Sequence, residues 1–197
     1  MKINKIKLGK KIISKETPPY IIAEIGVNHE GSLSMAKKLI YLAKKGGADA
    51  EKFQTYKAHL ITSKFAKSYW DTKKEKTKSQ FALFKKYDLF EREHYKKLSN
   101  YCKKIKIEFI STPFDINAVD MLDDLVKFFK ISSSDITNFP LLKKVASKKK
   151  PIILSTGAST LKEIKKAFNF LKKNNCKNIF LLHCILNYPT INSDANL

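Results

Sequence analysis

Six short apolar runs alternate along the chain with longer segments whose apolar residues recur at helical spacing. The runs contain too few polar residues for strands that expose one face to water, so both faces of each strand should be buried. Strands of this kind, separated by helices, are typical of βαβ units and of a parallel sheet. The predicted strands are Tyr20–Ile25, Ala50–Gln54, Glu108–Ser111, Val126–Ile131, Pro151–Ser155 and Asn178–His183.

The segments between these runs carry helix signals. The apolar residues from Leu33 to Ala43 fall on one helical face, and Gly46 with Gly47 ends that helix. Thr160-x-x-Glu163 is a candidate capping box at the start of another helix. The other predicted elements are a helix over Glu91–Ile105, a helix around Gln80–Lys86, a shorter helix opened by Asn138-Phe-Pro140 and a small hairpin within residues 5–13.

Six such steps fit either an open doubly wound α/β sheet or a TIM-type (β/α)8 barrel. No G-x-G-x-x-G follows the first strand, where a dinucleotide-binding fold requires it. Polar residues stand at the carboxyl end of every strand, where barrels build their active sites. We therefore predict one domain over residues 1–197, a C-terminally truncated barrel of about six β/α units. Since six strands cannot close an eight-stranded barrel, its first and last strands should present open edges.

The formal net charge of +21 could indicate a nucleic-acid-binding protein. However, Arg92 is the only arginine, and base readout relies on the guanidinium fork. The lysines recur in every predicted helix, which favours solvated helix faces. The sequence also has no apolar run long enough to span a membrane and no secretory signal, and its three cysteines form no C-x-x-C pair. These features predict a cytoplasmic protein with no membrane or nucleic-acid partner.

Lys52 and Lys130 are lysines on two different predicted strands. Lys52 shares one side of its strand with Gln54, two residues later, and Lys130 lies in the fourth strand. Buried lysine is rare unless it is paired with an anion. Together with hydroxyl groups at neighbouring strand ends, the two ammonium groups predict one site for a small, multiply anionic ligand. The remaining polar residues at strand ends are Glu24, Asn28, His29, Ser111, Thr112, Ser133, Asp135, Ser155, Thr156, His183, Asn187 and Tyr188.

These residues also have purely structural interpretations. A lone lysine near a strand end can extend along the surface, and hydroxyls at strand ends often form turns or helix caps. His29 and His183 could be hydrogen-bonded core histidines. No H-x-x-x-H or H-E-x-x-H spacing points to a local metal site, and we assign no metal ligand within the chain.

Six strings, distributed over nearly the whole chain, occur in an order that is far more specific than any single motif. They are AEIGVNHEGS (23–32), GGADAEKFQTY (46–56), FISTPFD (109–115), KISSSDITNFPLL (130–142), KPIILSTGASTLKEI (150–164) and LLHCILNYPT (181–190). In this order they resemble the N-terminal domain of the N-acetylneuraminate (sialic acid) synthases, a family that also holds the legionaminic and pseudaminic acid synthases.

The resemblance implies a carbon–carbon bond-forming transferase that condenses phosphoenolpyruvate with the aldehyde of an N-acetylated amino sugar, such as N-acetylmannosamine, to form a nonulosonic acid. C3 of phosphoenolpyruvate attacks the aldehyde, water attacks C2, and phosphate leaves. By the same resemblance, the residues that bind phosphoenolpyruvate are Lys52, Thr112, Lys130, Ser133 and Ser155. Those that face the sugar are Glu24, Gln54 and Tyr188, and the candidate acid–base residues are Glu24 and Asp135.

The sequence departs from this family at three positions. Asp135 stands where the family usually has glutamate, which is one methylene longer. Leu186 occupies a position where some members place a polar ligand of phosphoenolpyruvate, and Asn187 beside it is a candidate replacement. Glu51 stands where an apolar residue is usual. Strand alternation aims it away from Lys52 and toward the helix layer, where an unpaired carboxylate is costly.

The resemblance also implies a divalent metal, Mn or Mg, and a homodimer for the full-length protein. The two metal-binding histidines of the family and its antifreeze-like C-terminal domain would follow residue 197. We therefore expect this chain alone to bind no catalytic metal and to turn over nothing.

Three other functions fit parts of the sequence. The chain could be a truncated, catalytically inactive barrel remnant or scaffold. A 3-deoxy-heptulosonate-type aldolase shares the barrel and phosphoenolpyruvate but not this order of motifs. A lysine-rich nucleic-acid binder fits the net charge alone.

Overall fold

The computed structural model describes residues 5–187 and 189–196. The chain divides into two units, each with its own parallel sheet. One unit, called the 19–126 unit, comprises Pro19–Val126, and the other, called the 127–197 unit, joins the segment ending at Pro18 to the chain from Lys127 onward. The protein is therefore an α/β protein with parallel strands, as the alternation of apolar runs predicts.

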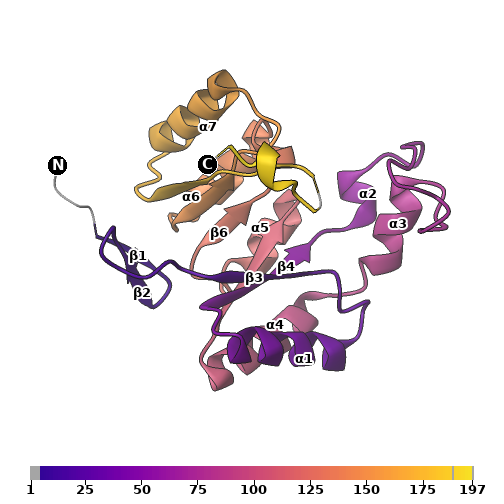
Figure 1. Cartoon of the computed structure of the whole chain (residues 1–197), viewed down its shortest axis with the longest axis horizontal. Coiled ribbons are helices and arrows are strands. Elements are labelled where there is room, and N and C mark those ends of the chain that lie inside the picture. Colours follow the sequence, from indigo (N-terminus) through magenta and orange to yellow (C-terminus); the bar gives the residue numbers. More distant parts are fainter. Residues whose placement is uncertain (1–4, 188, 197) are drawn as a thin grey trace. The chain divides into compact units, whose positions relative to one another are not determined.

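The 19–126 unit is built on a three-stranded parallel sheet in the order β3-β4-β5. Helices α1 and α4 contact each other; α1 also contacts β3 and β4, and α4 contacts β5 (Figure 1). The pairing of β3 with β4 shifts register between Glu24 and Gly26, at the carboxyl end of β3. The elements are β3 (Ile22–Gly26), α1 (Leu33–Lys45), β4 (Ala50–Thr55), α4 (Arg92–Ile105), β5 (Glu108–Pro113) and α5 (Ile116–Leu122).

A long excursion joins β4 to α4 and holds α2 (Ala58–Ile61) and α3 (Gln80–Tyr87). Its two ends are fastened together, because the Asp88 side chain accepts a hydrogen bond of 2.9 Å from the Ala58 backbone N–H. Lys57 Nζ also donates to the Asp88 carbonyl oxygen at 3.2 Å and lies 2.6 Å from Glu91 Oε1. Within the excursion, the Trp70 indole N–H lies within hydrogen-bond distance of the carbonyl oxygens of Glu75 and Thr77, at 3.2 and 3.3 Å.

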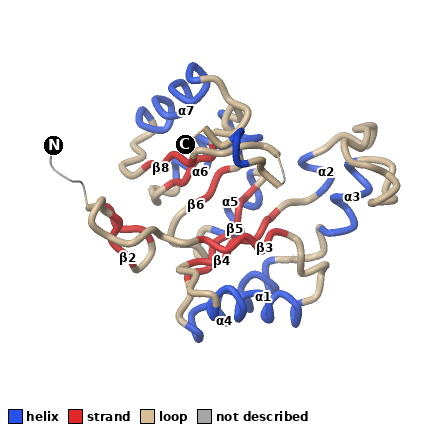
Figure 2. Tube along the Cα trace, in the orientation of Figure 1, coloured by secondary structure: helices blue, strands red, loops and turns tan. Residues whose placement is uncertain are grey.

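The 127–197 unit has a second three-stranded parallel sheet, in the order β6-β7-β8 (Figure 2). Helix α7 begins with the predicted capping box: Glu163 N–H donates to Thr160 Oγ1 at 3.3 Å, and Thr160 N–H donates to the Glu163 carboxylate at 2.8 Å. The elements are β1 (Ile6–Leu8), β2 (Lys11–Ile13), β6 (Phe129–Ile131), a 3-10 turn η1 (Ser133–Asp135), α6 (Phe139–Ser147), β7 (Ile152–Ser155), α7 (Leu161–Lys173), β8 (Ile179–Leu182) and η2 (Asn192–Asp194).

All six predicted strands are present, and so are the hairpin (β1 and β2) and the predicted helices. Helices α2 and α5 were not predicted. The predicted fourth strand, Val126–Ile131, is shorter in the structure and spans Phe129–Ile131. The expectation of two buried faces is wrong for β8, because Leu181 and Leu182 are 47% and 38% exposed. Among residues 5–187 and 189–196, β8 pairs only with β7.

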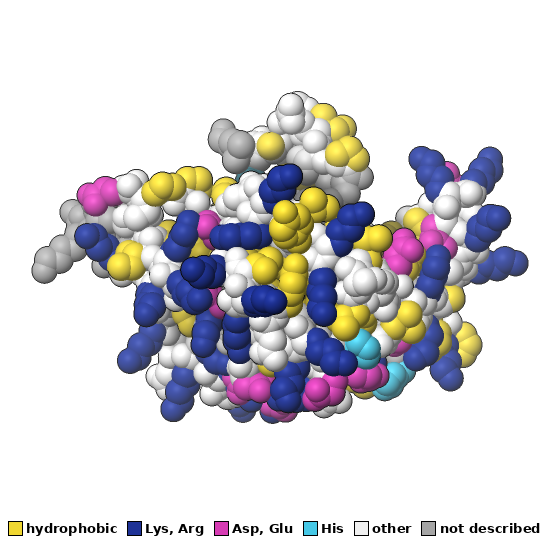
Figure 3. Space-filling view, turned by 90° about the horizontal axis from the view of Figure 1, so that it is seen from below, with side chains coloured by type: hydrophobic (Ala, Val, Ile, Leu, Met, Phe, Trp, Pro, Cys, Tyr) yellow, Lys and Arg dark blue, Asp and Glu magenta, His cyan; other side chains and the backbone are white. Residues whose placement is uncertain are grey.

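On the face that Figure 3 shows, the basic residues are dispersed. Figure 3 shows lysine and arginine side chains spread over the visible face of the molecule, with hydrophobic and acidic side chains between them. None of the described helices has the length and the apolar character needed to cross a membrane.

Candidate functional site

The first cluster of predicted site residues lies at the carboxyl ends of β3, β4 and β5. Lys52 pairs in register with Glu24 on β3, and its Nζ forms an ion pair with the Glu24 carboxylate. Lys52 Nζ also donates a hydrogen bond of 3.4 Å to Thr112 Oγ1 on β5. The Lys52 side chain is 11% exposed and that of Glu24 is 54% exposed. A nearly buried ammonium group therefore lies beside a carboxylate that water or a ligand can reach.

Gln54 belongs to the same cluster. A Cβ atom placed on Gly26 would lie 3.4 Å from Glu24 Oε1 and 3.6 Å from Gln54 Nε2, so both side chains approach the same point of the backbone. Gly26 has φ +57°, a left-handed conformation that favours glycine. The structure thus brings together Glu24, Lys52, Gln54 and Thr112, which we name the Lys52 cluster.

Glu51 points to the other side of β4, as strand alternation predicts. Its side chain is fully buried, and Cys102 Sγ on α4 donates a hydrogen bond to Glu51 Oε1 at 3.2 Å. Glu51 Oε2 has no hydrogen-bond partner among the described residues. Burial raises the pKa of Glu51 well above its ordinary value, and burial together with the Glu51 carboxyl raises the pKa of the Cys102 thiol. Both shifts favour the protonated, neutral forms of the two side chains.

A second cluster, named the Lys130 cluster, lies at the carboxyl ends of β6 and β7 in the 127–197 unit. Lys130 Nζ donates hydrogen bonds to Ser155 Oγ at 2.6 Å and to the Ile131 carbonyl oxygen at 3.0 Å. Ser133 Oγ accepts a hydrogen bond from the Gly157 N–H at 3.0 Å. A Cβ atom on Gly157 would lie only 3.0 Å from Ser133 Oγ, so the absence of a side chain allows this contact. Lys130, Ser133 and Ser155 are all buried.

Asp135 lies in η1, two residues after Ser133. Asn138 Nδ2 donates to Asp135 Oδ1 at 3.0 Å, and the Asn138 carbonyl oxygen Oδ1 accepts from the Leu141 N–H at the start of α6. Burial raises the pKa of Asp135, and the hydrogen bonds from Asn138 and Ser134 oppose this shift. The carboxyl group is thus held by the first turn of α6.

The last predicted site residues follow β8. Asn187 is exposed, and its backbone carbonyl oxygen accepts a hydrogen bond from Thr190 Oγ1. A Cβ atom on Gly157 would lie 3.1 Å from Leu186 Cδ2, so this segment approaches the Lys130 cluster. His183 is exposed and lies 2.6 Å from the Ala195 carbonyl oxygen. Tyr188 lies outside the described residues.

His29 is a core histidine, so the purely structural interpretation of this residue applies and not the functional one. It is 2% exposed and stacks on Phe90, with ring centroids 4.1 Å apart and an interplanar angle of 14°. The Gly31 N–H donates to His29 Nδ1 at 3.1 Å, so this nitrogen is an acceptor. Burial lowers the pKa of His29 to about 4. The imidazole is therefore neutral at physiological pH.

We predict that His29 stays neutral in the folded protein until the pH falls to about 4. Its folded pKa lies below the ordinary value of 6.5, so the unfolded chain binds a proton first, and this group should reduce stability as pH falls from 6.5 toward 4. An NMR titration of the histidine ring signals measures the pKa directly. The same chain in urea provides the control, and a midpoint near 6.5 in the folded state would contradict the prediction.

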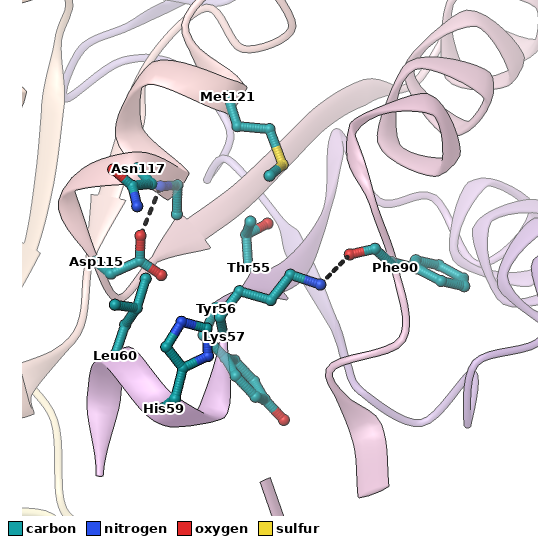
Figure 4. Close-up of a pocket in the computed structure, with 10 residues that line it drawn as sticks. Thr55, Tyr56, Lys57, His59, Leu60, Phe90, Asp115, Asn117 and Met121 are labelled. Carbon is teal, nitrogen blue, oxygen red and sulfur yellow. Dashed lines mark hydrogen bonds between the residues drawn. The ribbon is translucent and has the colours of Figure 1, made fainter. Parts of the chain in front are cut away.

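A small pocket, which was not predicted from the sequence, lies beside the end of β4 in the 19–126 unit. Its volume is about 130 Å³. Figure 4 shows Lys57, whose Nζ lies 3.5 Å from the Phe90 carbonyl oxygen, on one side of the pocket. Asp115, the N-cap of α5, lies on the other side and accepts a hydrogen bond from the Ala118 N–H. The position of Lys57, two residues after the end of β4, is a sequence signal from which the pocket could have been predicted. The lining residues are Thr55, Tyr56, Lys57, His59, Leu60, Phe90, Asp115, Asn117, Ala118 and Met121.

A divalent-metal site needs several donor side chains close together. Within residues 5–187 and 189–196, no three or more His, Cys, Asp or Glu side chains gather in a group that could hold a metal ion.

Comparisons with known proteins point to one family. A model of the NeuB family matches residues 39–197. An N,N'-diacetyllegionaminic acid synthase from Campylobacter jejuni is 48% identical over 182 residues, which are 90% of this chain and 54% of that protein. The chain spans about half the length of the curated relatives it matches.

Two solved structures are similar in fold. The N-acetylneuraminic acid synthetase of Leptospira borgpetersenii, in complex with citrate, has a TM-score of 0.84 and 33% identity, over 98% of this chain and 64% of that one. A truncated 3-deoxy-D-arabino-heptulosonate 7-phosphate synthase from Thermotoga maritima has a TM-score of 0.65 at 15% identity, over 91% of this chain and 55% of that one, which shows a likeness of fold alone. The family model and the identity to the Campylobacter jejuni synthase together establish that this chain belongs to the NeuB family.

Proposed function

We propose that this chain binds phosphoenolpyruvate and an N-acetylated amino sugar, and that it takes part in their condensation to a nonulosonic acid. C3 of phosphoenolpyruvate forms a bond to the aldehyde carbon of the open-chain sugar. Water adds to C2, and the bond between C2 and the phosphate oxygen breaks to release phosphate. The chain would form part of an N-acetylneuraminate synthase-like transferase, and the folds of its relatives support a (β/α)8-type barrel with about six β/α units in this chain.

The observation that carries this proposal is the pair of lysine clusters at carboxyl ends of parallel strands. Lys52 and Lys130 are each only 9% exposed, and each has a hydroxyl group within hydrogen-bond distance of Nζ. A buried ammonium group beside a hydroxyl suits a phosphate or carboxylate oxygen, and phosphoenolpyruvate carries both groups. The citrate bound by the Leptospira borgpetersenii synthetase is also a small polyanion, which supports this ligand class.

The roles of the remaining residues follow the family resemblance. The phosphate and carboxylate of phosphoenolpyruvate would be held by fixed cations and hydroxyls, whose fields are strongest where water is excluded. Gln54 and Tyr188 would face the sugar together with Glu24, which is exposed enough to exchange a proton with a ligand. Asp135 would handle the attacking water, and the raised pKa of this carboxyl suits a proton-transfer role. The proposed phosphoenolpyruvate ligands are Lys52, Thr112, Lys130, Ser133, Ser155 and Asn187.

Two further proposals concern a metal ion and an assembly. The family resemblance supports a divalent Mn or Mg ion and a homodimer. Among the described residues, no three or more His, Cys, Asp or Glu side chains form a group that could hold the ion.

Titration calorimetry of the chain with phosphoenolpyruvate tests the proposal. Binding should be detected, and it should weaken as salt is raised, because ionic attraction contributes to it. Pyruvate, which lacks the phosphate, serves as the matched ligand control and should bind much more weakly. Equal binding of the two ligands, or no binding of either, would overturn the proposal.

Two further measurements in the same samples define the reaction. The sugar is tested by titrating N-acetylmannosamine against a diacetamido trideoxyhexose, and the identity to N,N'-diacetyllegionaminic acid synthases favours the second. Phosphate release with Mn²⁺, sugar and phosphoenolpyruvate distinguishes a catalytic chain from the alternative of an inactive scaffold.

A further inference from the structure

We infer that Tyr95 is a positioning residue, which holds the end of β4 so that the Gln54 amide faces the sugar. The inference rests on the proposed function, in which Gln54 contacts the sugar. Tyr95 lies on α4, is 4% exposed, and donates a hydrogen bond of 3.0 Å from its hydroxyl to the Gln54 carbonyl oxygen. It would act through Gln54 and would not touch the substrates.

The Gln54 carbonyl needs this donor because β3 no longer supplies one. The carbonyls of a strand alternate between its two neighbours, and the next carbonyl, that of Thr55, accepts from the Phe114 N–H on the β5 side at 3.1 Å. The Gln54 carbonyl therefore points toward the β3 side. There the register shift at Gly26 ends the pairing opposite Phe53, one residue before Gln54. The Tyr95 hydroxyl takes the place of the missing strand partner.

Tyr95 is itself held in place. Phe90 packs against its ring edge-on at a centroid distance of 5.8 Å, and Phe90 also stacks on His29. Burial raises the pKa of Tyr95 to about 12, so the hydroxyl remains a donor throughout the physiological range. The helix face that carries Tyr95 is also buried at Leu98 and Cys102. The donor is thus fixed by the core before any ligand binds.

The backbone of β4 is held on both sides at this point. Tyr95 binds the carbonyl of Gln54, and Thr55 Oγ1 lies 2.7 Å from Ser111 Oγ on β5. The Cα atom that carries the Gln54 side chain is therefore held in place. Its amide nitrogen lies near Gly26 and the Glu24 carboxylate, which is the sugar-facing side of the Lys52 cluster in the proposed function. A fixed amide favours a sugar whose polar group matches that position.

Replacing Tyr95 with phenylalanine removes the hydroxyl and keeps the ring. We expect the affinity for the preferred amino sugar to fall about threefold to tenfold, the range that the loss of one hydrogen bond gives. The affinity for phosphoenolpyruvate should stay unchanged, because Lys52 and Thr112 do not bind Tyr95. The Gln54 side-chain amide signals in the NMR spectrum of the ligand-free chain should shift or broaden. Tyr101→Phe, on the same helix, is the matched control and should change none of these quantities.

A double-mutant cycle with Gln54→Ala decides whether Tyr95 acts through Gln54. In the Gln54→Ala background, Tyr95→Phe should have no further effect on sugar affinity. Additive effects, or an unchanged Gln54 amide signal in Tyr95→Phe, would overturn the inference. If the wild-type chain binds no sugar, the proposed function fails, and the Gln54 amide signal still decides whether Tyr95 positions this side chain.

Discussion

Replacing Lys130 with methionine is expected to weaken phosphoenolpyruvate binding by about a hundredfold, the size of effect seen when one partner of a buried, hydrogen-bonded charge pair is removed. Methionine has nearly the same length and keeps the apolar stem packed, so the change removes the ammonium group and little else. Lys130 Nζ donates to Ser155 Oγ at 2.6 Å, and both residues are buried. The loss therefore affects the anion site directly. Titration calorimetry with phosphoenolpyruvate measures it.

Lys143→Met provides the matched control for this variant. Lys143 is an exposed lysine on α6 of the same unit, so its replacement removes the same charge without touching the cluster. Its effect on affinity should be less than about twofold, the range of a surface charge. If Lys130→Met bound phosphoenolpyruvate as tightly as Lys143→Met, Lys130 would have no part in the site.

Replacing Glu51 with valine should stabilise the folded chain by about 1–3 kcal/mol, which is the cost of burying a polar group without a full set of partners. Glu51 is fully buried between β4 and α4, and its Oε2 has no partner among the described residues. Its contact with Cys102 is one weak hydrogen bond from a thiol. A higher melting temperature, followed by circular dichroism, would confirm the effect. A lower one would show that the bond to Cys102 outweighs the cost of burial.

The same residue should make stability depend on pH. Because folding raises the pKa of Glu51 above its ordinary value of 4.5, the folded chain keeps a proton that the unfolded chain releases above that pH. The contribution of Glu51 is therefore fully present below pH 4.5 and is lost as pH rises toward the raised pKa, by about 1.4 kcal/mol per pH unit. Glu51→Gln keeps the shape but cannot titrate. Relative to this variant, the wild-type melting temperature should fall with rising pH, and parallel curves would contradict the assignment.

Periodicity was sufficient to predict most of the strands and the side to which their residues point. A period of two placed Lys52 and Gln54 on one side of β4 and Glu51 on the other, and the structure has Glu51 against Cys102 of α4. Short elements were harder to predict. Helix α5 has only seven residues. Asp115 as a candidate N-cap, followed by the apolar residues Ala118, Val119 and Leu122, would have been sufficient to predict it.

The long-range contacts of the candidate site could not be read from local patterns. The hydrogen bond from Tyr95 to Gln54 joins residues 41 positions apart. It depends on a register shift in β3 that no sequence motif indicates. The ion pair of Lys52 with Glu24 depends on the same pairing of β3 with β4. Such contacts are set by how strands and helices pack, whereas sequence periodicity reports only which side of an element is buried.

The fastening of the excursion between β4 and α4 has a consequence for how this protein can diversify. The bond from Ala58 to Asp88 and the contact of Lys57 with Glu91 close the segment at its base, close to the sheet. Doubling the length of a closed loop costs only about 0.6 kcal/mol, so residues between these anchors can be inserted, deleted or exchanged at little thermodynamic cost. Selection could thus remodel the excursion as a separate module while the strands that carry Lys52 and Gln54 stay constant.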